Sequence, residues 1–436
     1  MLDTRKNQQR ILEKLGIEKL NPMQEETHKA IQSASEVVLL SPTGTGKTLA
    51  FLLPIIEMLN AENPEVQVLI LAPSRELAMQ IEQVAREMGS GFKTNAVYGG
   101  RPFNQDKIDL KHRPAILVGT PGRIADHLRR GTFSTKSIKT LVLDEFDKSL
   151  EIGFEEEMSE ITWALEAVEK KILTSATQRA KIPKFVGIKN PKKINYLKEG
   201  ESQLQLKTVV APNKDKLETL VDLLCHIGAE PGIIFCNLKD SIDEISDYLY
   251  DKRISHGCFY GGMEQMDRER ALVKFRNGTH QLLLATDLAA RGIDIPEMKF
   301  IIHFHLPLKE HEFIHRNGRT ARMNSDGTAY ILKYENEVLP EYVKDVEVEE
   351  LSKSPLPAPS LWETLYISGG RRDKISKGDI AGLFFKQGKL KSDELGVIEI
   401  QPDHAFVSVP KTKVDSVINL VNNTKLKTKK VRISVL

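Results

Sequence analysis

In the stretch TLVLDEFDKS, residues 140–149, three carboxylates follow an apolar run, and a phenylalanine, Phe146, stands among them. The apolar residues before the acids predict a buried strand that carries Asp144 to its carboxyl end. There Asp144 could contact Mg²⁺, and Glu145 beside it could deprotonate an attacking water. The spacing therefore indicates a nucleotide-hydrolysis site, with a strand that merely ends in acids as the alternative.

A second candidate, SPTGTGKT, directly follows the apolar run VVLL at residues 37–40. A strand, a glycine-bearing turn and GKT at the start of a helix predict a phosphate-binding loop. Its backbone N–H groups would surround phosphates at the helix N-terminus, Lys47 would reach the β/γ-phosphates, and Thr48 would ligate Mg²⁺. Ser41 stands where the general pattern has its first glycine. The candidate nucleotide-binding residues of the loop are Thr43, Gly44, Thr45, Gly46, Lys47 and Thr48.

Short apolar runs that alternate with helical patterns surround both motifs. Near-continuous apolar strands separated by helices predict a parallel sheet that is covered by helices on both faces. Because both motifs follow predicted strands, they would lie at the carboxyl edge of that sheet, where open α/β sheets bind ligands. The predicted strands lie at residues 37–40, 66–72, 114–121, 140–147 and 170–177.

The same alternation pauses around residues 195–207 and then resumes, which predicts a second α/β unit and an internal duplication. The second unit has no GKT sequence of its own, so one ATP shared between the two units is the simplest interpretation. Its predicted strands lie at residues 232–237, 256–262, 281–287 and 300–307.

Residues 334–360 are first acidic and then proline-rich, which predicts a terminal helix followed by an extended linker. Beyond them the patterns run β-α-β-β-α-β, the order of a small ferredoxin-like sheet. The sequence thus predicts an α/β chain of three domains. The predicted ranges are 1–205 for lobe one, 206–345 for lobe two, 346–360 for the linker and 361–436 for the tail domain.

Composition argues against several classes of protein. Hydrophobic residues at 40% and charged residues at 28% are ordinary for a globular chain. No apolar run approaches the roughly 18 residues that a membrane span needs, and the first residues do not read as a signal peptide. Cys225, Cys236 and Cys258 lack CxxC spacing, which argues against a disulfide framework or a zinc knuckle. We expect a soluble protein of the reducing cytoplasm.

The tail domain is the basic part of the chain. Residues 361–436 contain fourteen Lys and Arg against eight Asp and Glu, a net charge of +6, whereas the whole chain carries +2. A basic domain on a mildly acidic body predicts a polyanion partner, although a solvated basic face would give the same charge.

Ten short motifs, in family order, make the chain similar to the DEAD-box ATP-dependent RNA helicases of superfamily 2. The resemblance covers residues 16–322 and implies two tandem RecA-like parallel-sheet domains. The C-terminal residues resemble the RNA-recognition-like domain of DbpA/YxiN-type bacterial helicases, which implies a small α+β, RRM-like fold. The motifs are GIEKLNPMQ, SPTGTGKT, APSRELA, Gly99–Gly100, TPGR, DEFD, SAT, MEQMDR, ATDLAARGID and HRNGRTAR.

The resemblance also implies ATP and Mg²⁺ as cofactors and a role for individual residues. Gln24 would bond the adenine edge, and Asp294 would contact the ribose. Arg319 and Arg322 would reach the γ-phosphate as arginine fingers, which are worth roughly 10³–10⁵ in rate. The implied catalytic residues are Lys47, Asp144, Glu145, Arg319 and Arg322, and the metal ligands are Thr48 and Asp144.

Asp147 is implied to pair with Ser175 and Thr177, which would link hydrolysis to domain closure. Several residues depart from the family's pattern, Asn317 and Ala321 only mildly. The third letter of DEFD is usually alanine, but every ionisable residue around Phe146 is kept, so we expect a functional site with local repacking. Ile17 replaces the usual aromatic residue of the Q motif, which leaves the selectivity for ATP open.

RNA in this family is held by its backbone across both lobes. The matching positions carry glycines and arginines, which permit close approach and pair with phosphates. Helix caps and turn glycines are the structural alternative for any one of them. The implied RNA-binding residues are Pro73, Arg75, Gly99, Gly100, Thr120 and Arg123 in lobe one and Arg268 and Thr286 in lobe two.

In the tail domain, Tyr366 lies where RNA-recognition sheets place a stacking aromatic residue, and Phe406 matches a second such position. His404 and Val409 stand at the other two, so the RNP1 motif is incomplete. Tyr366 and Phe406 could equally be core residues. The residues predicted to contact RNA in this domain are Tyr366, Arg371, Arg372 and Lys374.

Taken together, these features predict a monomeric ATP-dependent RNA helicase without a membrane partner, which separates structured RNA locally. In the resembled family the tail domain anchors the enzyme to large-subunit ribosomal RNA, so ribosome assembly is the first hypothesis for its biological role. A general helicase for messenger RNA and an ATP-gated RNA clamp with little turnover are the alternatives.

Overall fold

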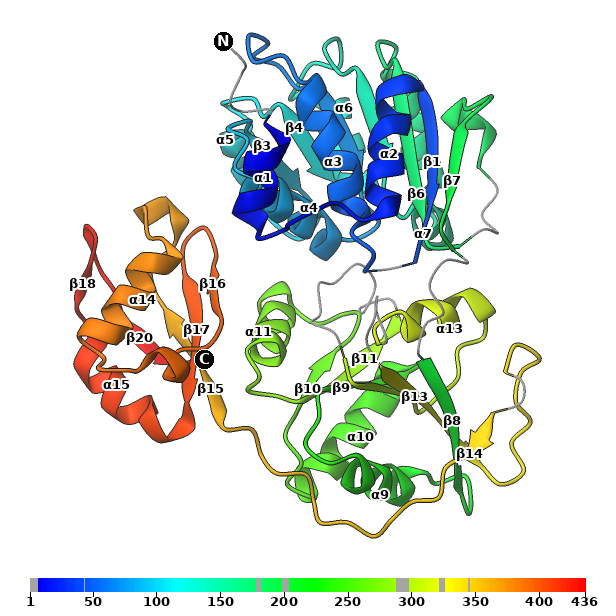
Figure 1. Cartoon of the computed structure of the whole chain (residues 1–436), viewed down its shortest axis with the longest axis vertical. Helices are drawn as coiled ribbons and strands as arrows, with labels where there is room; N and C mark the ends of the chain where they lie inside the picture. Colours follow the sequence, from blue (N-terminus) through cyan, green and yellow to red (C-terminus); the bar gives the residue numbers. More distant parts are fainter. Residues whose placement is uncertain are drawn as a thin grey trace. The chain divides into compact units, whose positions relative to one another are not determined.

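The computed structural model describes residues 7–42, 44–177, 182–197, 204–287, 298–320, 326–343 and 346–436. These residues form two compact units, one up to residue 197 and one from residue 204 onward. The first unit contains lobe one, and the second contains lobe two and the tail domain (Figure 1).

Lobe one is built on a seven-stranded parallel sheet. Its strands are β1 (Glu36–Leu40), β2 (Val68–Leu71), β3 (Thr94–Val97), β4 (Ile116–Gly119), β5 (Thr140–Leu143), β6 (Lys170–Ser175) and β7 (Lys192–Asn195). They lie in the order β3-β4-β2-β5-β6-β1-β7. Val37 and Leu39 enter one core cluster and Val38 enters another, so both faces of the sheet are buried. Burial on both faces explains why the strand sequences are almost continuously apolar.

Helices cover both faces of this sheet (Figure 1). They are α1 (Gln8–Leu15), α2 (Pro22–Ser33), α3 (Lys47–Met58), α4 (Arg75–Glu87), α5 (Phe103–Asp109), α6 (Pro121–Arg129), α7 (Phe146–Ile152), α8 (Glu155–Ala164) and the 3₁₀ turn η2 (Lys184–Val186). Buried residues of α2, α3 and α4 join the core cluster on one face, and those of α6 and α8 join the cluster on the other.

Lobe two repeats this architecture. Its strands are β8 (Leu204–Ala211), β9 (Gly232–Cys236), β10 (His256–Phe259), β11 (Leu282–Thr286), β12 (Phe300–His303), β13 (Gly327–Tyr334) and β14 (Glu347–Val348). Their order is β10-β11-β9-β12-β13-β8-β14, and all of them pair in parallel. When each sheet is numbered from its own first strand, the two orders are identical, which confirms tandem domains of one type. The described helices of lobe two are α9 (Leu217–Ile227), α10 (Lys239–Asp251), α11 (Gln265–Arg276) and α13 (Glu310–Asn317).

The terminal helix expected at the start of residues 334–360 is not formed in the described part of that segment. Turns and the two-residue strand β14, which pairs with β8, take its place. Pro340 has no backbone N–H and disfavours helical geometry in the residue before it. Leu339 and Tyr342 instead pack against Phe313 of α13. The expectation of a helix was therefore wrong.

The tail domain has the predicted β-α-β-β-α-β order. The elements are β15 (Trp362–Ile367), α14 (Lys377–Lys386), β16 (Ile398–Ile400), β17 (Ala405–Pro410), α15 (Val414–Val421) and β20 (Ile433–Val435). The strands form an antiparallel sheet in the order β16-β17-β15-β20. An additional hairpin of β18 (Lys425–Leu426) and β19 (Lys429–Lys430) precedes the last strand. None of the described helices of the chain is long and apolar enough to span a membrane.

Candidate nucleotide and RNA site

The phosphate-binding loop joins β1 to α3, and its turn depends on glycine. Gly44 and Gly46 have φ values of 83° and 84°, a left-handed region that residues with a side chain rarely enter. The ammonium group of Lys47 donates hydrogen bonds to two backbone carbonyl oxygens of the same loop, at 2.7 and 2.9 Å. Lys47, the first residue of α3, is therefore bonded to the beginning of the loop. Thr43, which is predicted to line the loop, lies outside the described residues.

The N-terminus of α2 is bonded to the same loop. Asn21 caps α2, and Gln24 completes a capping box with it through hydrogen bonds of 2.9 and 3.0 Å. The carboxamide of Asn21 donates to the Thr45 carbonyl at 3.1 Å, and that of Gln24 donates to the Gly46 carbonyl at 3.3 Å. Gln24 thus lies beside the loop, and Asn21 is a contact that the sequence did not indicate.

Asp144 and Glu145 lie at the carboxyl end of β5, and both are buried. Glu145 has a positive φ of 46°, so the chain turns sharply between the two carboxylates before α7 begins. The hydroxyl of Thr174 in β6 donates to Asp144 and accepts from the backbone N–H of Glu145, at 3.1 Å. Burial and the neighbouring Glu145 carboxylate raise the pKa of Asp144 to about 6. The Thr174 hydrogen bond and the charge of Lys47 oppose this rise.

Asp147 and the SAT sequence meet as the resemblance implied. The hydroxyl groups of Ser175 and Thr177 donate to the same carboxylate oxygen of Asp147, at 2.8 and 3.0 Å. The backbone N–H of Thr177 also donates to the Ser175 hydroxyl, at 2.9 Å. These bonds join the start of α7 to the end of β6, so a displacement of one segment would be transmitted to the other.

The order of the strands divides the carboxyl edge of the lobe-one sheet into two halves. The neighbouring strands β5, β6 and β1 end at the acidic turn, the SAT sequence and the phosphate-binding loop. The neighbouring strands β3, β4 and β2 end near Gly99–Gly100, at Thr120 and near Pro73, the positions implied for RNA. Nucleotide and RNA candidates therefore lie side by side on one edge, which no single motif indicates.

Arg75 begins α4, and its guanidinium group lies against Gly99–Gly100. A Cβ atom on Gly100 would fall 2.3 Å from Nη1 of Arg75, and the φ of Gly100 is +89°. Glycine is therefore required here, both for the turn and for the close approach of the arginine. Thr120 precedes α6 as its N-cap, and Arg123 follows in the first turn of that helix. The RNA candidates of lobe one thus come from three adjacent loops.

Arg316 of the HRNGRTAR motif, in α13 of lobe two, is buried and extensively hydrogen-bonded, and the sequence reasoning missed it. Its side chain is 1% exposed, and its Nε and Nη2 atoms bond the Asp287 carboxylate at 2.6 and 2.5 Å. It also donates to the His305 carbonyl at 2.6 Å. Arg319, a predicted arginine finger, is buried just after α13, and its backbone N–H bonds the Arg316 carbonyl at 3.0 Å.

The other lobe-two candidates are only partly described. The guanidinium carbon of Arg268 in α11 lies 4.9 Å from the centre of the Phe259 ring, which packs at the end of β10. Thr286 is the last residue of β11 and is half-buried. Asp294 and Arg322, implied to contact the ribose and the γ-phosphate, lie outside the described residues.

Three protein-family models match successive parts of the chain. They describe a DEAD/DEAH box helicase at residues 21–185, a helicase conserved C-terminal domain at residues 215–324 and a DbpA RNA binding domain at residues 364–435. ATP-dependent RNA helicase DbpA of Bacillus subtilis is 30% identical over 98% of this chain and 96% of its own length, and that of Escherichia coli is 31% identical over the same shares. The chain belongs to the DEAD-box family of ATP-dependent RNA helicases.

Solved structures of DEAD-box helicases have the same fold. Dbp5 of S. cerevisiae bound to RNA and ADP BeF3 matches with a TM-score of 0.66 and 26% identity, over 75% of this chain and 86% of that chain. Mss116 bound to single-stranded RNA and UDP-BeF matches with a TM-score of 0.69 and 26% identity, over 79% and 78%. As a member of this family, the protein is an RNA-stimulated ATPase and RNA helicase.

Phe146 takes the place of the usual alanine in the acidic turn of this DEAD-box helicase. Its side chain is 2% exposed and belongs to the core cluster that contains Leu143, Leu173 and Val186. The ring therefore fills the core beneath the turn. The carboxylates of Asp144 and Asp147 accept their hydrogen bonds from hydroxyl groups of Thr174, Ser175 and Thr177, not from the segment that carries the ring.

Tyr366 of the helicase's tail domain is half-buried beside two other rings. Its ring centre lies 5.6 Å from that of His404 and 6.0 Å from that of Phe406, its partner across β15 and β17. Phe406 is 2% exposed. Of the two positions that could stack on RNA, Phe406 is thus a buried residue, and Tyr366 keeps partial access to solvent.

Lobe two of the helicase contacts the same sheet of the tail domain through α11 and the turn after it. Arg276 donates to both carboxylate oxygens of Glu399 in β16, at 2.7 and 2.6 Å. The hydroxyl groups of Thr279 and Thr364 lie 2.7 Å apart. Part of the sheet face predicted to bind RNA is therefore a contact surface within the chain.

The basic residues predicted to hold RNA follow β15 in the 3₁₀ turn η3 (Arg371–Asp373) and the residue after it. Arg371 donates to the Ile400 carbonyl at 2.7 Å, so its side chain is bonded to the fold. Arg372 pairs with Asp403 at 2.9 Å, and both side chains are largely exposed. Lys374 ends the turn with a φ of 59°. The turn thus presents two exposed basic side chains at the surface, Arg372, which is paired with Asp403, and Lys374.

Proposed function

We propose that the helicase hydrolyses ATP with Mg²⁺ at the half-edge formed by β1, β5 and β6, and that RNA lies along the neighbouring half. The observation that carries the proposal is the meeting of the Lys47 loop with Asp144 and Glu145 at the ends of β1 and β5, the two strands that flank β6. Lys47 would exchange its two carbonyl partners for phosphate oxygens. Gln24, beside the loop, would bond the adenine edge.

The buried carboxylates fit a bound Mg²⁺. Asp144 and Glu145 are adjacent and buried, and both conditions raise the pKa of Asp144. A divalent cation would offset both of them, and Thr48 supplies a hydroxyl oxygen in the first turn of α3. When bound, Mg²⁺ would neutralise charge that develops on the phosphate oxygens.

Three residues of the chain have the remaining proposed roles in hydrolysis. Glu145 is the proposed general base: its carboxylate would accept the proton of the attacking water, while Thr174 holds its backbone N–H. Arg319 would stabilise negative charge on the γ-phosphate. Through its two hydroxyl partners, Asp147 would couple a movement of the acidic turn to a movement at the end of β6.

Asp144→Asn is expected to stabilise the metal-free protein at pH 8 but not at pH 4. A folded-state pKa raised from 3.8 to about 6 means that the ionised carboxylate lowers stability above pH 6 by about 3 kcal/mol. As the pH falls from 6 toward 4, the carboxyl becomes protonated in the folded state and this loss disappears. Urea unfolding in EDTA at several pH values measures the difference between variant and wild type.

The exposed Glu169→Gln is the matched control for this experiment, since it removes a carboxylate whose side chain is 71% exposed. Its effect on stability should be small at every pH. An Asp144→Asn variant that is no more stable than the wild type at pH 8 would contradict the raised pKa and weaken the argument for a metal at this carboxylate.

We further propose that the RNA is structured RNA of the large ribosomal subunit and that the protein acts as a cytoplasmic monomer. The match of residues 364–435 to the DbpA RNA binding domain and the +6 charge of the tail domain support a dedicated RNA anchor. A general helicase for messenger RNA would use the same lobes without such an anchor, and a clamp would bind without turnover.

Steady-state ATPase rates with different RNAs test the proposed target. We expect strong stimulation by a ribosomal fragment that contains the peptidyl-transferase-centre hairpin, and little by no RNA or by an unrelated structured RNA of equal length. Equal stimulation by both RNAs would identify a general helicase. Absence of stimulation together with ATP-dependent RNA binding would identify a clamp.

A further inference from the structure

Asp106 is a buried carboxylate surrounded by three basic side chains in lobe one. It lies in α5 and has no exposed surface. Nε of Arg101 lies 2.9 Å from one carboxylate oxygen, while Nε of Arg123 at 2.6 Å and Nε2 of His127 at 3.1 Å meet the other. Burial of a carboxylate is costly unless partners compensate it, so these basic groups account for its place in the core.

Both arginines come from loops on the RNA half of the sheet edge. Arg101 directly follows Gly100 after β3, and Arg123 lies in the first turn of α6 after β4. Nη2 of Arg123 also donates to the Arg101 carbonyl at 3.0 Å, so the two loops are bonded directly as well as through Asp106. The side chains of Arg101 and Arg123 remain 22% and 12% exposed, so part of each reaches the surface.

A phenylalanine ring restricts Arg123 from another side. Phe103, at the start of α5, stacks on His127 with ring centres 4.5 Å apart. The guanidinium carbon of Arg123 lies 4.9 Å from the centre of the Phe103 ring, and that of Arg130 lies 4.3 Å from it. Arg123 is thus held between a carboxylate and an aromatic ring, which fixes the direction of its guanidinium group.

Two arginines placed this close together repel each other, and unrestrained arginine side chains sample many rotamers. The Asp106 carboxylate between Arg101 and Arg123 offsets the repulsion. It accepts a hydrogen bond from Nε of Arg123 and is ion-paired with Nε of Arg101, whose Nη2 donates a hydrogen bond to Asp109 at 2.5 Å. Binding of a phosphate to such a fixed pair costs less conformational entropy of the arginine side chains than binding that must first order two mobile arginines. Backbone phosphates of RNA, which carry no base information, suit this arrangement.

We propose that Arg101 and Arg123 form a two-arginine site for RNA phosphates on lobe one, and that Asp106 is the positioning residue that holds the pair. The inference rests on the proposed placement of RNA along this half of the edge. Arg101 lies outside both the Gly99–Gly100 pair and the TPGR motif, so it is an additional contact. Asp106 acts only through the arginines.

Asp106→Asn tests the positioning role in the full-length protein. The amide keeps the size of the side chain but removes the negative charge that is ion-paired with both arginines, while the hydrogen bond from Arg101 to Asp109 stays in place. We expect the RNA concentration for half-maximal ATPase stimulation to rise about tenfold, while turnover at saturating RNA stays within about twofold of the wild type. If Asp106 did not position the arginines, the half-maximal RNA concentration should fall instead, because removal of a negative charge near RNA strengthens the electrostatic attraction.

Arg101 variants test the second half of the proposal, and they remain informative even if Asp106→Asn does not fold. Arg101→Gln is expected to raise the half-maximal RNA concentration and to reduce the salt dependence of binding by about 0.7 in log–log slope for a single strand. Arg101→Lys keeps the charge but loses the Nε contact to Asp106, so it should weaken RNA binding nearly as much. In the double variant of Asp106→Asn and Arg101→Gln, the losses should be less than additive.

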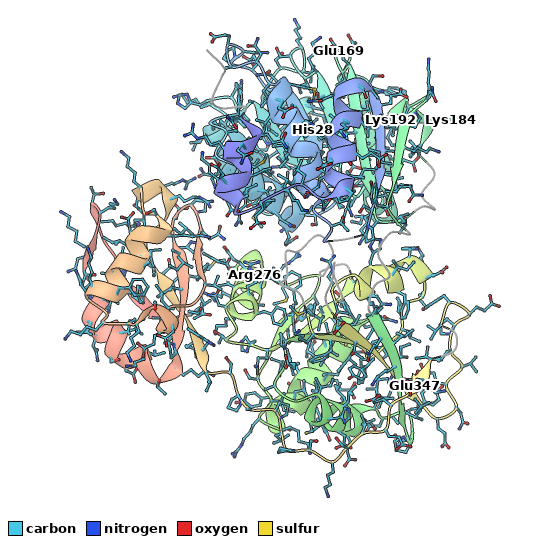
Figure 2. The ribbon with its side chains drawn as sticks, viewed as in Figure 1. His28, Glu169, Lys184, Lys192, Arg276 and Glu347 are labelled. Carbon is cyan, nitrogen blue, oxygen red and sulfur yellow. The ribbon has the colours of Figure 1, made fainter. Side chains whose placement is uncertain are left out.

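Glu169→Gln is the matched control, since it removes one carboxylate just before β6, at the amino edge of the same sheet (Figure 2). It should change neither the half-maximal RNA concentration nor the turnover. A fraction of unfolded protein would lower the turnover of a sample and leave the half-maximal concentration unchanged, so folding defects can be told apart.

Unchanged or tighter RNA binding by Asp106→Asn would overturn the positioning role. Wild-type RNA binding by Arg101→Gln would remove Arg101 from the site, and wild-type binding by Arg101→Lys would show that its position does not matter. Failure of the proposed function is a separate result: Arg123→Gln would then leave RNA stimulation unchanged as well, and RNA would lie elsewhere.

Discussion

Glu145→Gln is expected to lower the RNA-stimulated rate of ATP hydrolysis by about 10²–10⁴-fold, the usual contribution of a general base. The amide keeps the size of the side chain but cannot accept the proton of the attacking water. The backbone at Glu145 should stay in place, because its N–H is bonded to the Thr174 hydroxyl. Steady-state ATPase assays at saturating RNA measure the loss.

Binding should survive this substitution. Lys47, Asp144 and the hydrogen bonds of Asp147 are unchanged in the variant, so ATP-dependent RNA binding should stay within about threefold of the wild type. Glu156→Gln, an exposed position in α8, is the control and should hydrolyse ATP at the wild-type rate. If Glu145→Gln kept more than about a tenth of the rate, another group would have to be the base.

The interior strands of both parallel sheets can be predicted from the sequence because they are buried on two faces. The runs VVLL and TLVL, for example, are apolar throughout and correspond to β1 and β5. The edge strand β3, with the sequence TNAV, has only Val97 buried, and the first four residues of β8 are all partly or fully exposed. A search for continuous apolar runs misses such strands, since one face of each carries polar residues.

Strand order could not be predicted, because it depends on pairing between distant segments. Leu40 at the end of β1 lies beside Ser175 at the end of β6, and this register brings the phosphate-binding loop to the SAT sequence. The two sheets share their order but no obvious sequence motif. The division of the edge into a nucleotide half and an RNA half follows from that order.

Motifs identify the loops of the site but not the side chains that hold them. Thr174 directly precedes SAT and bonds both Asp144 and Glu145, yet its residue type does not distinguish it from other threonines in strands. Asp106 lies between two RNA motifs, in a helix that the sequence patterns did not predict. The role of each residue comes from a partner far away in sequence, and the pattern of one segment contains no such information.

In the tail domain the order of elements was predicted and the exposed face was not. Alternation within each strand is a local signal, so β15 and β17 could be placed correctly. The pairing of Glu399 with Arg276 and of Thr364 with Thr279 depends instead on how lobe two packs against this sheet. Sequence spacing alone therefore left the stacking and core interpretations of Tyr366 equal.

Phe146→Ala is expected to lower the free energy of unfolding of lobe one by about 3–5 kcal/mol, the usual cost of truncating a buried phenylalanine. The ring is 2% exposed, and it shares a core cluster with Leu143, Leu173 and Val186. Truncation would therefore leave a cavity beneath the DEFD turn. Urea unfolding followed by circular dichroism measures the loss.

Turnover should respond much less than stability, because the carboxylates of Asp144 and Asp147 are held by hydroxyl groups that do not involve the ring. Well below the unfolding temperature, the RNA-stimulated rate of Phe146→Ala should stay within about threefold of the wild type. Phe133→Ala, in the same core cluster but outside the turn, is the control for stability loss alone. A rise in turnover of more than about tenfold in Phe146→Ala only would mean that the ring holds hydrolysis back, since a ring that merely fills the core cannot restrain the chemical step.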